Sequence, residues 1–94
     1  MSTKNLIEGL QILIKYMDNK ECSHVYAKYE EIFFEETDHP VSNTDLKKLS
    51  KLGWHQEIDA EAIGIDYDDL LDEDGNFDIR FYNPEERWQC YVSY

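Results

Sequence analysis

The clearest local signal in the chain lies between residues 41 and 54, VSNTDLKKLSKLGW. Ser42, followed three residues later by Asp45, has the spacing of a capping box, with Asp in the place of the usual Glu. Gly53 stands where a residue in the left-handed conformation commonly ends a helix. The stretch therefore predicts a short helix with a defined start and a defined end.

The same stretch predicts which side of this helix is buried. Val41 and Leu46 have the spacing of a hydrophobic staple, and Leu46 and Leu49 share one face. Trp54 is expected to fold back onto Leu49. The opposite face carries the only basic cluster of the chain, Lys47, Lys48 and Lys51. In so acidic a chain we interpret these lysines as a solvated face that offsets nearby carboxylates, not as a nucleic-acid site.

An apolar stripe of helical period predicts an earlier helix over Thr3–Met17. Its members are Leu6, Leu10, Leu13, Ile14 and Met17, and Ile7 and Ile12 widen the face expected to be buried. Ser2 or Thr3 can cap its start, and Asp18-Asn19 supplies a turn at its end. Gly9 costs this helix about 1 kcal/mol relative to Ala, unless a close crossing needs the missing side chain.

Extended structure is predicted in two places. Residues 24–34 mix β-branched and aromatic side chains with Lys and Glu, which favours one strand, His24–Phe34, interrupted near Glu30. Residues 77–82 and 87–92 alternate in polarity around Asn83-Pro84-Glu85-Glu86, which predicts a C-terminal hairpin. Arg80 is expected to pair with Glu85 or Glu86.

Together these elements predict an α+β fold of one domain, residues 1–94. The expected order is helix, strand, helix, acidic loop and hairpin, with two helices packed on one face of a small antiparallel sheet. A chain of 94 residues supports one modest core.

Charge is the dominant feature of the composition. The chain has 21 Asp and Glu against 9 Lys and Arg, a formal charge of −12. Direct binding to nucleic acid or to an anionic membrane is disfavoured because both repel it, so a basic protein is the expected partner. No apolar run of membrane-spanning length and no signal peptide is evident, and we expect a cytoplasmic protein of a host cell.

The negative charge is concentrated in residues 57–78, which contain ten acidic and no basic side chains. Six apolar residues are expected to hold this segment against the body of the protein: Ile58, Ala62, Ile63, Ile65, Leu70 and Leu71. We predict an irregular loop with a short helical turn near Tyr67–Leu71.

Catalytic and metal-binding chemistry has weak support. No phosphate loop, G-x-S-x-G or H-E-x-x-H motif is present, so we expect a non-enzyme without cofactor. Residues 72–76, DEDGN, fail the EF-hand register and predict a turn. Cys22, His24, His55 and Cys90 could in principle bind zinc, but their spacing is unsuitable. The two cysteines are expected to be buried thiols, although a single bridge between them is geometrically allowed.

The stretch from Val41 to His55, preceded by Ile12–Tyr16 and followed by a terminal strand containing Trp88, resembles a set of small acidic proteins of phages and mobile elements. The resemblance implies a helix, an acidic strand segment, a capped helix ending Leu-Gly-Trp and a closing hairpin. The chain departs from that pattern by an acidic insertion between His55 and Phe77. Small acidic phage proteins of this kind include anti-CRISPR and anti-restriction DNA mimics, so the resemblance implies, by analogy of class, an inhibitor of host defence.

Two interpretations of the acidity remain open: a solvated surface that promotes solubility, or a carboxylate array that imitates a nucleic-acid backbone. In the second, the partner-binding residues are Glu57, Asp59, Glu61, Asp66, Tyr67, Asp68, Asp69, Asp72, Glu73 and Asp74. Helpers are Glu30, Glu31, Glu35, Glu36 and Asp38, and further tyrosine anchors are Tyr82 and Tyr94.

The leading hypothesis is an inhibitor of a host defence nuclease or nucleic-acid-binding complex. One alternative is an immunity or antitoxin-like protein that blocks a basic toxin. Another is a small metal-binding or catalytic domain that uses Cys22, His24 and the carboxylates.

Overall fold

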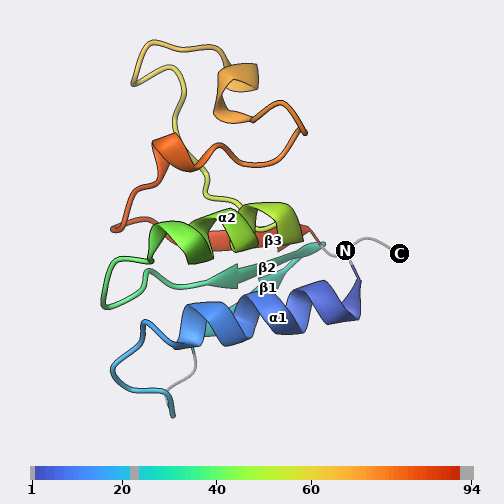
Figure 1. Cartoon of the computed structure of the whole chain (residues 1–94), viewed down its shortest axis with the longest axis vertical. Helices are drawn as coiled ribbons and strands as arrows, with labels where there is room; N and C mark the ends of the chain where they lie inside the picture. Colours follow the sequence, from blue (N-terminus) through green and yellow to red (C-terminus); the bar gives the residue numbers. More distant parts are fainter. Residues whose placement is uncertain (1, 22–23, 92–94) are drawn as a thin grey trace.

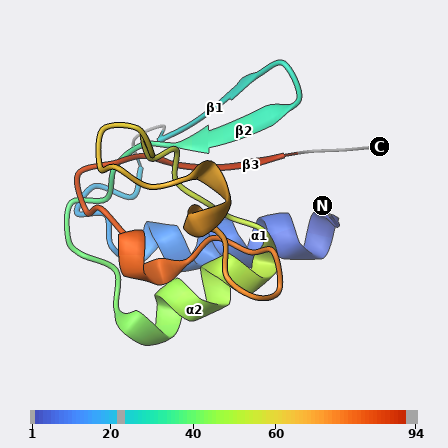
Figure 2. The same ribbon diagram turned by 90° about the horizontal axis from the view of Figure 1, so that it is seen from above.

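The computed structural model describes residues 2–21 and 24–91, which form a layer of helices on a layer of strands (Figures 1 and 2). The helices are α1 (Thr3–Ile14) and α2 (Asn43–Leu52), and the strands are β1 (Val25–Lys28), β2 (Glu31–Phe34) and β3 (Trp88–Tyr91). The strands form one antiparallel sheet in the order β1-β2-β3. The prediction of an α+β fold with both helices on one sheet face is confirmed.

Helix α2 has the predicted N-cap, Ser42, and the predicted glycine at its end. The second half of the capping box does not form, because the Ser42 N–H donates to the Tyr16 hydroxyl (3.2 Å) and not to the Asp45 carboxylate. The Ser42 hydroxyl accepts a hydrogen bond from the Asp45 N–H (3.3 Å), and Gly53 takes a φ of 96°. The chain then turns back, so that the Trp54 N–H donates to the Leu49 carbonyl (3.0 Å). This left-handed ending places the Trp54 indole in the core.

The Asp45 carboxylate joins the two helices. It accepts hydrogen bonds from the Tyr16 hydroxyl (2.5 Å) and from Lys15 Nζ (2.9 Å) of the segment that follows α1. The Tyr16 bond, followed by the Lys15 bond, holds the pKa of the buried Asp45 carboxyl below its ordinary value. Asp45 therefore connects the end of the α1 segment to the start of α2, and its two bonds are strongest when the carboxyl is charged.

Replacing Asp45 with Asn is expected to cost about 2 kcal/mol of stability at pH 7, because a neutral amide then takes the place of the charged acceptor of two hydrogen bonds, one of them from Lys15. A lowered folded-state pKa stabilises the protein above the ordinary Asp pKa, and this contribution is lost as the pH falls through the folded value. The difference between wild type and Asp45→Asn in urea unfolding should therefore shrink from about pH 4 downward. A stability difference between wild type and Asp45→Asn that stays constant from pH 7 to pH 2.5 would contradict the role given to the charged Asp45. The control is Asp68→Asn, at an exposed carboxylate.

Helix α1 is shorter than predicted and buries a narrower face. It ends at Ile14, and residues 15–17 continue as tighter turns with bonds to the third residue before. Ile7 is 48 % exposed, so the prediction that it widens the buried face is wrong. The buried face instead presents Gly9 directly to the ring of Trp54.

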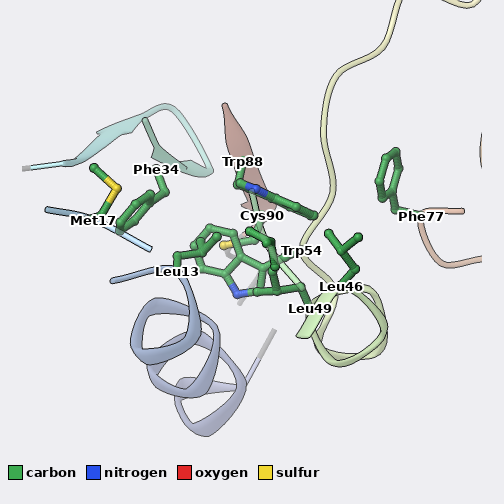
Figure 3. Packing of buried hydrophobic residues seen from close by; sticks show 10 residues of the cluster. Leu13, Met17, Phe34, Leu46, Leu49, Trp54, Phe77, Trp88 and Cys90 are labelled. Carbon is green, nitrogen blue, oxygen red and sulfur yellow. The ribbon is translucent and has the colours of Figure 1, made fainter. Parts of the chain in front are cut away.

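The core lies between the helices and the sheet (Figure 3). The side chains most completely removed from solvent are Leu13, Phe34, Leu49, Trp54, Trp88 and Cys90. They come from both helices, two strands and the turn after α2. Because the indole of Trp54 packs against α1, the glycine in that helix is a packing requirement.

The prediction of one strand over residues 24–34 is wrong, because this stretch is a hairpin. Val25 pairs with Phe34 and Lys28 with Glu31, so the interruption predicted near Glu30 is the turn itself. The turn residue Tyr29 has a φ of 57° and is 94 % exposed. A left-handed Tyr is uncommon in a turn, which is why the sequence carries no hairpin signature here.

The predicted C-terminal hairpin is also wrong. Residues 79–81 form a short 3₁₀ helix, η2 (Ile79–Phe81), and β3 pairs with β2 instead. The Asp78 carboxylate accepts a bond from the Arg80 N–H (3.0 Å) and so favours a helical turn over an extended chain. Arg80 pairs with Asp78 through Nη2 (2.7 Å) and not with Glu85 or Glu86.

Candidate functional site

Residues 57–78, here called the acidic lobe, project from the body beyond α2 and β3 (Figure 1). The lobe leaves the sheet after a bridge between His55 and Gln89, and a second bridge joins two of its own residues, Leu71 and Phe77. Its 3₁₀ helix, η1 (Tyr67–Leu70), confirms the predicted helical turn. The buried residues Ala60, Leu70 and Phe77 anchor it. Of the predicted anchors, Leu70 is buried and Ile58 and Ile65 are half-buried, but Ala62, Ile63 and Leu71 are exposed, so the prediction is wrong for these three.

Nine of the ten lobe carboxylates are exposed. They are Glu57, Asp59, Glu61, Asp66, Asp68, Asp69, Asp72, Glu73 and Asp74. The tenth, Asp78, is buried, and its carboxylate accepts a hydrogen bond from the Arg80 side chain. This bond lowers the pKa of Asp78. All nine belong to the set singled out from the sequence.

Several of these carboxylates hold the lobe backbone in place. Asp72 Oδ1 accepts from the N–H groups of Asp74 and Asn76 (both 2.9 Å), which closes the turn predicted there. Asp69 accepts from the Asp66 N–H (3.3 Å) in the capping box of η1. Asp59 accepts from the Ala62 N–H (3.3 Å) in a further turn. Local hydrogen bonds of this kind favour a defined loop conformation.

The remaining exposed carboxylates differ in what surrounds them. Glu57 lies 3.7 Å from Arg87 Nη2, the distance of a loose ion pair. In the part of the chain that the structure describes, no hydrogen bond or ion pair engages the carboxylates of Glu61, Asp68, Glu73 and Asp74.

Two basic residues of α2 lie near one end of this set. Lys47 and Lys51 border the same depression, about 250 Å³, as Asp72 and Asp74. This placement supports the interpretation that they offset lobe charge. Glu61, Asp68 and Glu73 do not line that depression. These three lobe carboxylates are therefore the most available to a partner.

The predicted tyrosine anchors have different fates. Tyr67 is 70 % exposed within the lobe. Tyr82 is structural, because its ring stacks on Trp88 at 5.9 Å and its hydroxyl accepts from the Val41 N–H (2.9 Å). The prediction that Tyr82 is an exposed anchor is therefore wrong. Tyr94 lies outside the described residues.

The predicted helper carboxylates lie outside the acidic lobe. Glu30 and Glu31 belong to the β1–β2 hairpin, and Glu31 lies against the same groove as the lobe. The others, Glu35, Glu36 and Asp38, follow β2. Asp38 has a structural use, because its carboxylate accepts from the Asp18 N–H (2.7 Å).

A groove of about 870 Å³, here called the outer groove, lies between the lobe and the sheet face turned away from the helices. The sheet side includes Tyr26, Phe33, Gln89 and Tyr91, and the lobe side includes Tyr67. Sequence reasoning missed this groove. The alternation of residues 87, 89 and 91 against 88 and 90 was the available signal, since alternate strand residues share a face.

The groups considered for zinc are poorly suited to it. Burial raises the pKa of the Cys90 thiol to about 11, which disfavours the thiolate that a zinc ion would bind. Among residues 2–21 and 24–91, no group of three or more His, Cys, Asp or Glu side chains could hold a metal ion. Cys90 is a buried free thiol, which confirms the prediction for this residue, and Cys22 lies outside the described residues.

No known protein family, curated protein or solved structure matches this chain. The resemblance to phage and mobile-element proteins therefore stays a prediction. A search of the described residues finds no helix both long enough and apolar enough to span a bilayer.

Proposed function

We propose that the chain is a non-enzymatic inhibitor of phage or mobile-element origin that occupies the basic nucleic-acid site of a host defence nuclease or related complex. The observation that carries the proposal is the acidic lobe, with nine exposed carboxylates and no basic residue in one anchored segment. Such an array presents negative charge to a cationic groove as duplex DNA does. Duplex DNA carries one negative charge per roughly 1.7 Å of axis.

The anchoring of the lobe supports recognition as well as solubility. Carboxylates on a free coil must be ordered when they bind, and that ordering costs affinity. Here the local bonds of Asp59, Asp69 and Asp72 hold the backbone, and Leu70 and Phe77 attach it to the body. Folding therefore orders much of the lobe backbone before the lobe binds a partner, so less affinity is lost to ordering on binding.

Reversing two free lobe charges, Asp68→Lys with Glu73→Lys, is expected to weaken partner binding by about tenfold or more, because each charge change at a surface pair alters binding by up to about 1 kcal/mol. The matched control is Glu21→Lys with Glu85→Lys, two exposed carboxylates outside the lobe. Both double variants change the net charge by the same four units, so long-range attraction falls equally.

The measurement is capture of partners from a lysate of the cell that hosts the gene, with identification by mass spectrometry and a binding curve for the recovered protein. The proposal expects a nucleic-acid-binding protein whose affinity falls with rising salt and with the lobe variant only. Equal losses for the two variants would contradict the role of the lobe. Recovery of a toxin would favour the immunity alternative.

A further inference from the structure

The floor of the outer groove contains a polar group that the fold leaves unused. Gln89 is only 4 % exposed, and its Oε1 is buried with no hydrogen-bond partner in the described part of the chain. Its Nε2 lies 3.1 Å from His55 Nε2. A buried acceptor without a donor is costly, and Gln89 borders the groove. Because Oε1 is itself shielded from solvent, an N–H donor in the groove would bond to it only after the Gln89 carboxamide turns toward the groove.

The walls of the groove are tyrosine rings. Tyr91 is 55 % exposed and stacks on the His55 ring at 5.3 Å, and Tyr67 faces the groove from the lobe. Glu31, Glu57, Tyr67 and Tyr91 all line this groove. The Glu31 carboxylate, followed by burial, raises the pKa of Tyr91. Aromatic faces beside carboxylates attract cations.

The same wall already holds one guanidinium group, that of Arg87. Its centre lies 4.7 Å from the Phe33 ring, and Nη1 donates to the Tyr26 hydroxyl (2.9 Å). Glu57 lies 3.7 Å from Nη2. An aromatic face, an oxygen acceptor and a carboxylate therefore hold an arginine of this chain on the groove wall. Glu31, Asp59 and Glu86 line the groove as well, so among the described residues it has, with Glu57, four acidic residues against two basic ones, Lys28 and Arg87.

These observations favour one kind of occupant. An arginine side chain is planar, stacks on aromatic rings, and presents five donors to carboxylate and amide oxygens. A lysine ammonium matches the charge but not the flat faces. A nucleic acid is repelled by the negative charge of the chain.

We propose that the outer groove binds an arginine side chain from the basic surface of the partner, between the rings of Tyr67 and Tyr91 and above Gln89. This inference rests on the proposed function, since it names the partner group that the lobe would deliver to the groove. The lobe attracts the cationic surface, and the groove then selects a guanidinium.

The test uses two synthetic peptides and the full chain labelled with ¹⁵N. One peptide alternates glycine with three arginines, and the other has lysines in their place. The arginine peptide should shift the Gln89 side-chain amide and the backbone signals of His55 and Tyr91. It should bind about fivefold more tightly than the lysine peptide, the difference expected for stacking on tyrosine.

Two variants separate the groove from the lobe. Tyr67→Leu with Tyr91→Leu should abolish the preference for arginine, and Tyr67→Leu alone should reduce it. Both side chains are more than half exposed, so folding should persist. Asp68→Lys with Glu73→Lys should weaken both peptides and keep their ratio, because neither residue lines the groove.

Equal affinity of the wild-type chain for the two peptides would overturn the inference, as would shifts confined to residues 61–74. Either result would leave the lobe proposal standing. Groove signals that move with protein concentration alone would also overturn it, in favour of a second copy of the chain as the occupant. The peptide titration needs no natural partner, so failure to recover a DNA-binding protein would count against the proposed function alone.

Discussion

Replacing Gly9 with alanine is expected to lower the free energy of unfolding by about 3 kcal/mol, the upper end of the roughly 1–3 kcal/mol that overpacking a well-filled core costs. A Cβ at this position would overlap Nε1 of the Trp54 indole, which is itself fully buried between α1, α2 and the sheet. In a chain of this size the loss corresponds to a fall in melting temperature of about 10–20 °C.

The sign of this effect is informative. Helix propensity alone predicts that alanine stabilises a helix by about 1 kcal/mol relative to glycine. Gln11→Ala, at an exposed position of the same helix, is the control and should change stability by less than about 0.5 kcal/mol. Thermal unfolding of the three proteins makes the comparison. A Gly9→Ala variant as stable as wild type would mean that Trp54 does not pack against α1.

Replacing Phe77 with alanine should cost about 3–5 kcal/mol, the usual range for removing a buried aromatic ring. Phe77 is buried at the root of the acidic lobe and meets Trp88 edge-on, with ring centres 6.0 Å apart. Its carbonyl accepts a bond from the Ser50 hydroxyl of α2 (2.6 Å). The ring therefore attaches the lobe to the core of the protein.

Urea unfolding measures this cost, and amide exchange shows where the structure loosens. Backbone amides of the lobe should lose protection in Phe77→Ala. The control is Leu71→Ala in the same bridge, because Leu71 is exposed and should contribute about 1 kcal/mol or less. Equal losses for the two variants would indicate that the lobe is not anchored in the core.

The parts of the fold that local chemistry determines could be predicted from the sequence. Ser42 and Gly53 mark the ends of α2 by hydrogen bonds and a backbone angle within a few residues of the chain. The turn at residues 67–70 follows in the same way from closely spaced carboxylates and Leu70. Both predictions are confirmed because no distant partner decides them.

The strand predictions failed where the decision is not local. Pairing of β3 with β2 joins residues more than fifty positions apart, and nothing near Trp88 indicates that partner. The alternation of residues 77–82 suggested a strand, but these apolar side chains pack on the core from a 3₁₀ turn that Asp78 caps. The β1–β2 turn has Tyr29 where a hairpin usually has Asn or Gly.

The two parts of the candidate site, the acidic lobe and the outer groove, also differ in how far local sequence predicts them. The acidic lobe is continuous in sequence, so its charge could be counted directly. The outer groove combines three strands with the lobe, and the fold must be known before Gln89, Tyr91 and Tyr67 are seen to share it. Which lobe carboxylates are free and which hold the backbone also depends on geometry, as Asp72 and Asp68 illustrate.

The most direct measurement of the central claim is competition between this chain and duplex DNA for the recovered partner. If the acidic lobe stands in for a nucleic-acid backbone, a labelled duplex should be displaced from the partner by the wild-type chain and by the Glu21→Lys/Glu85→Lys control. The Asp68→Lys/Glu73→Lys variant should need about tenfold more protein for the same displacement. A stable ternary complex of partner, DNA and this chain would contradict the account.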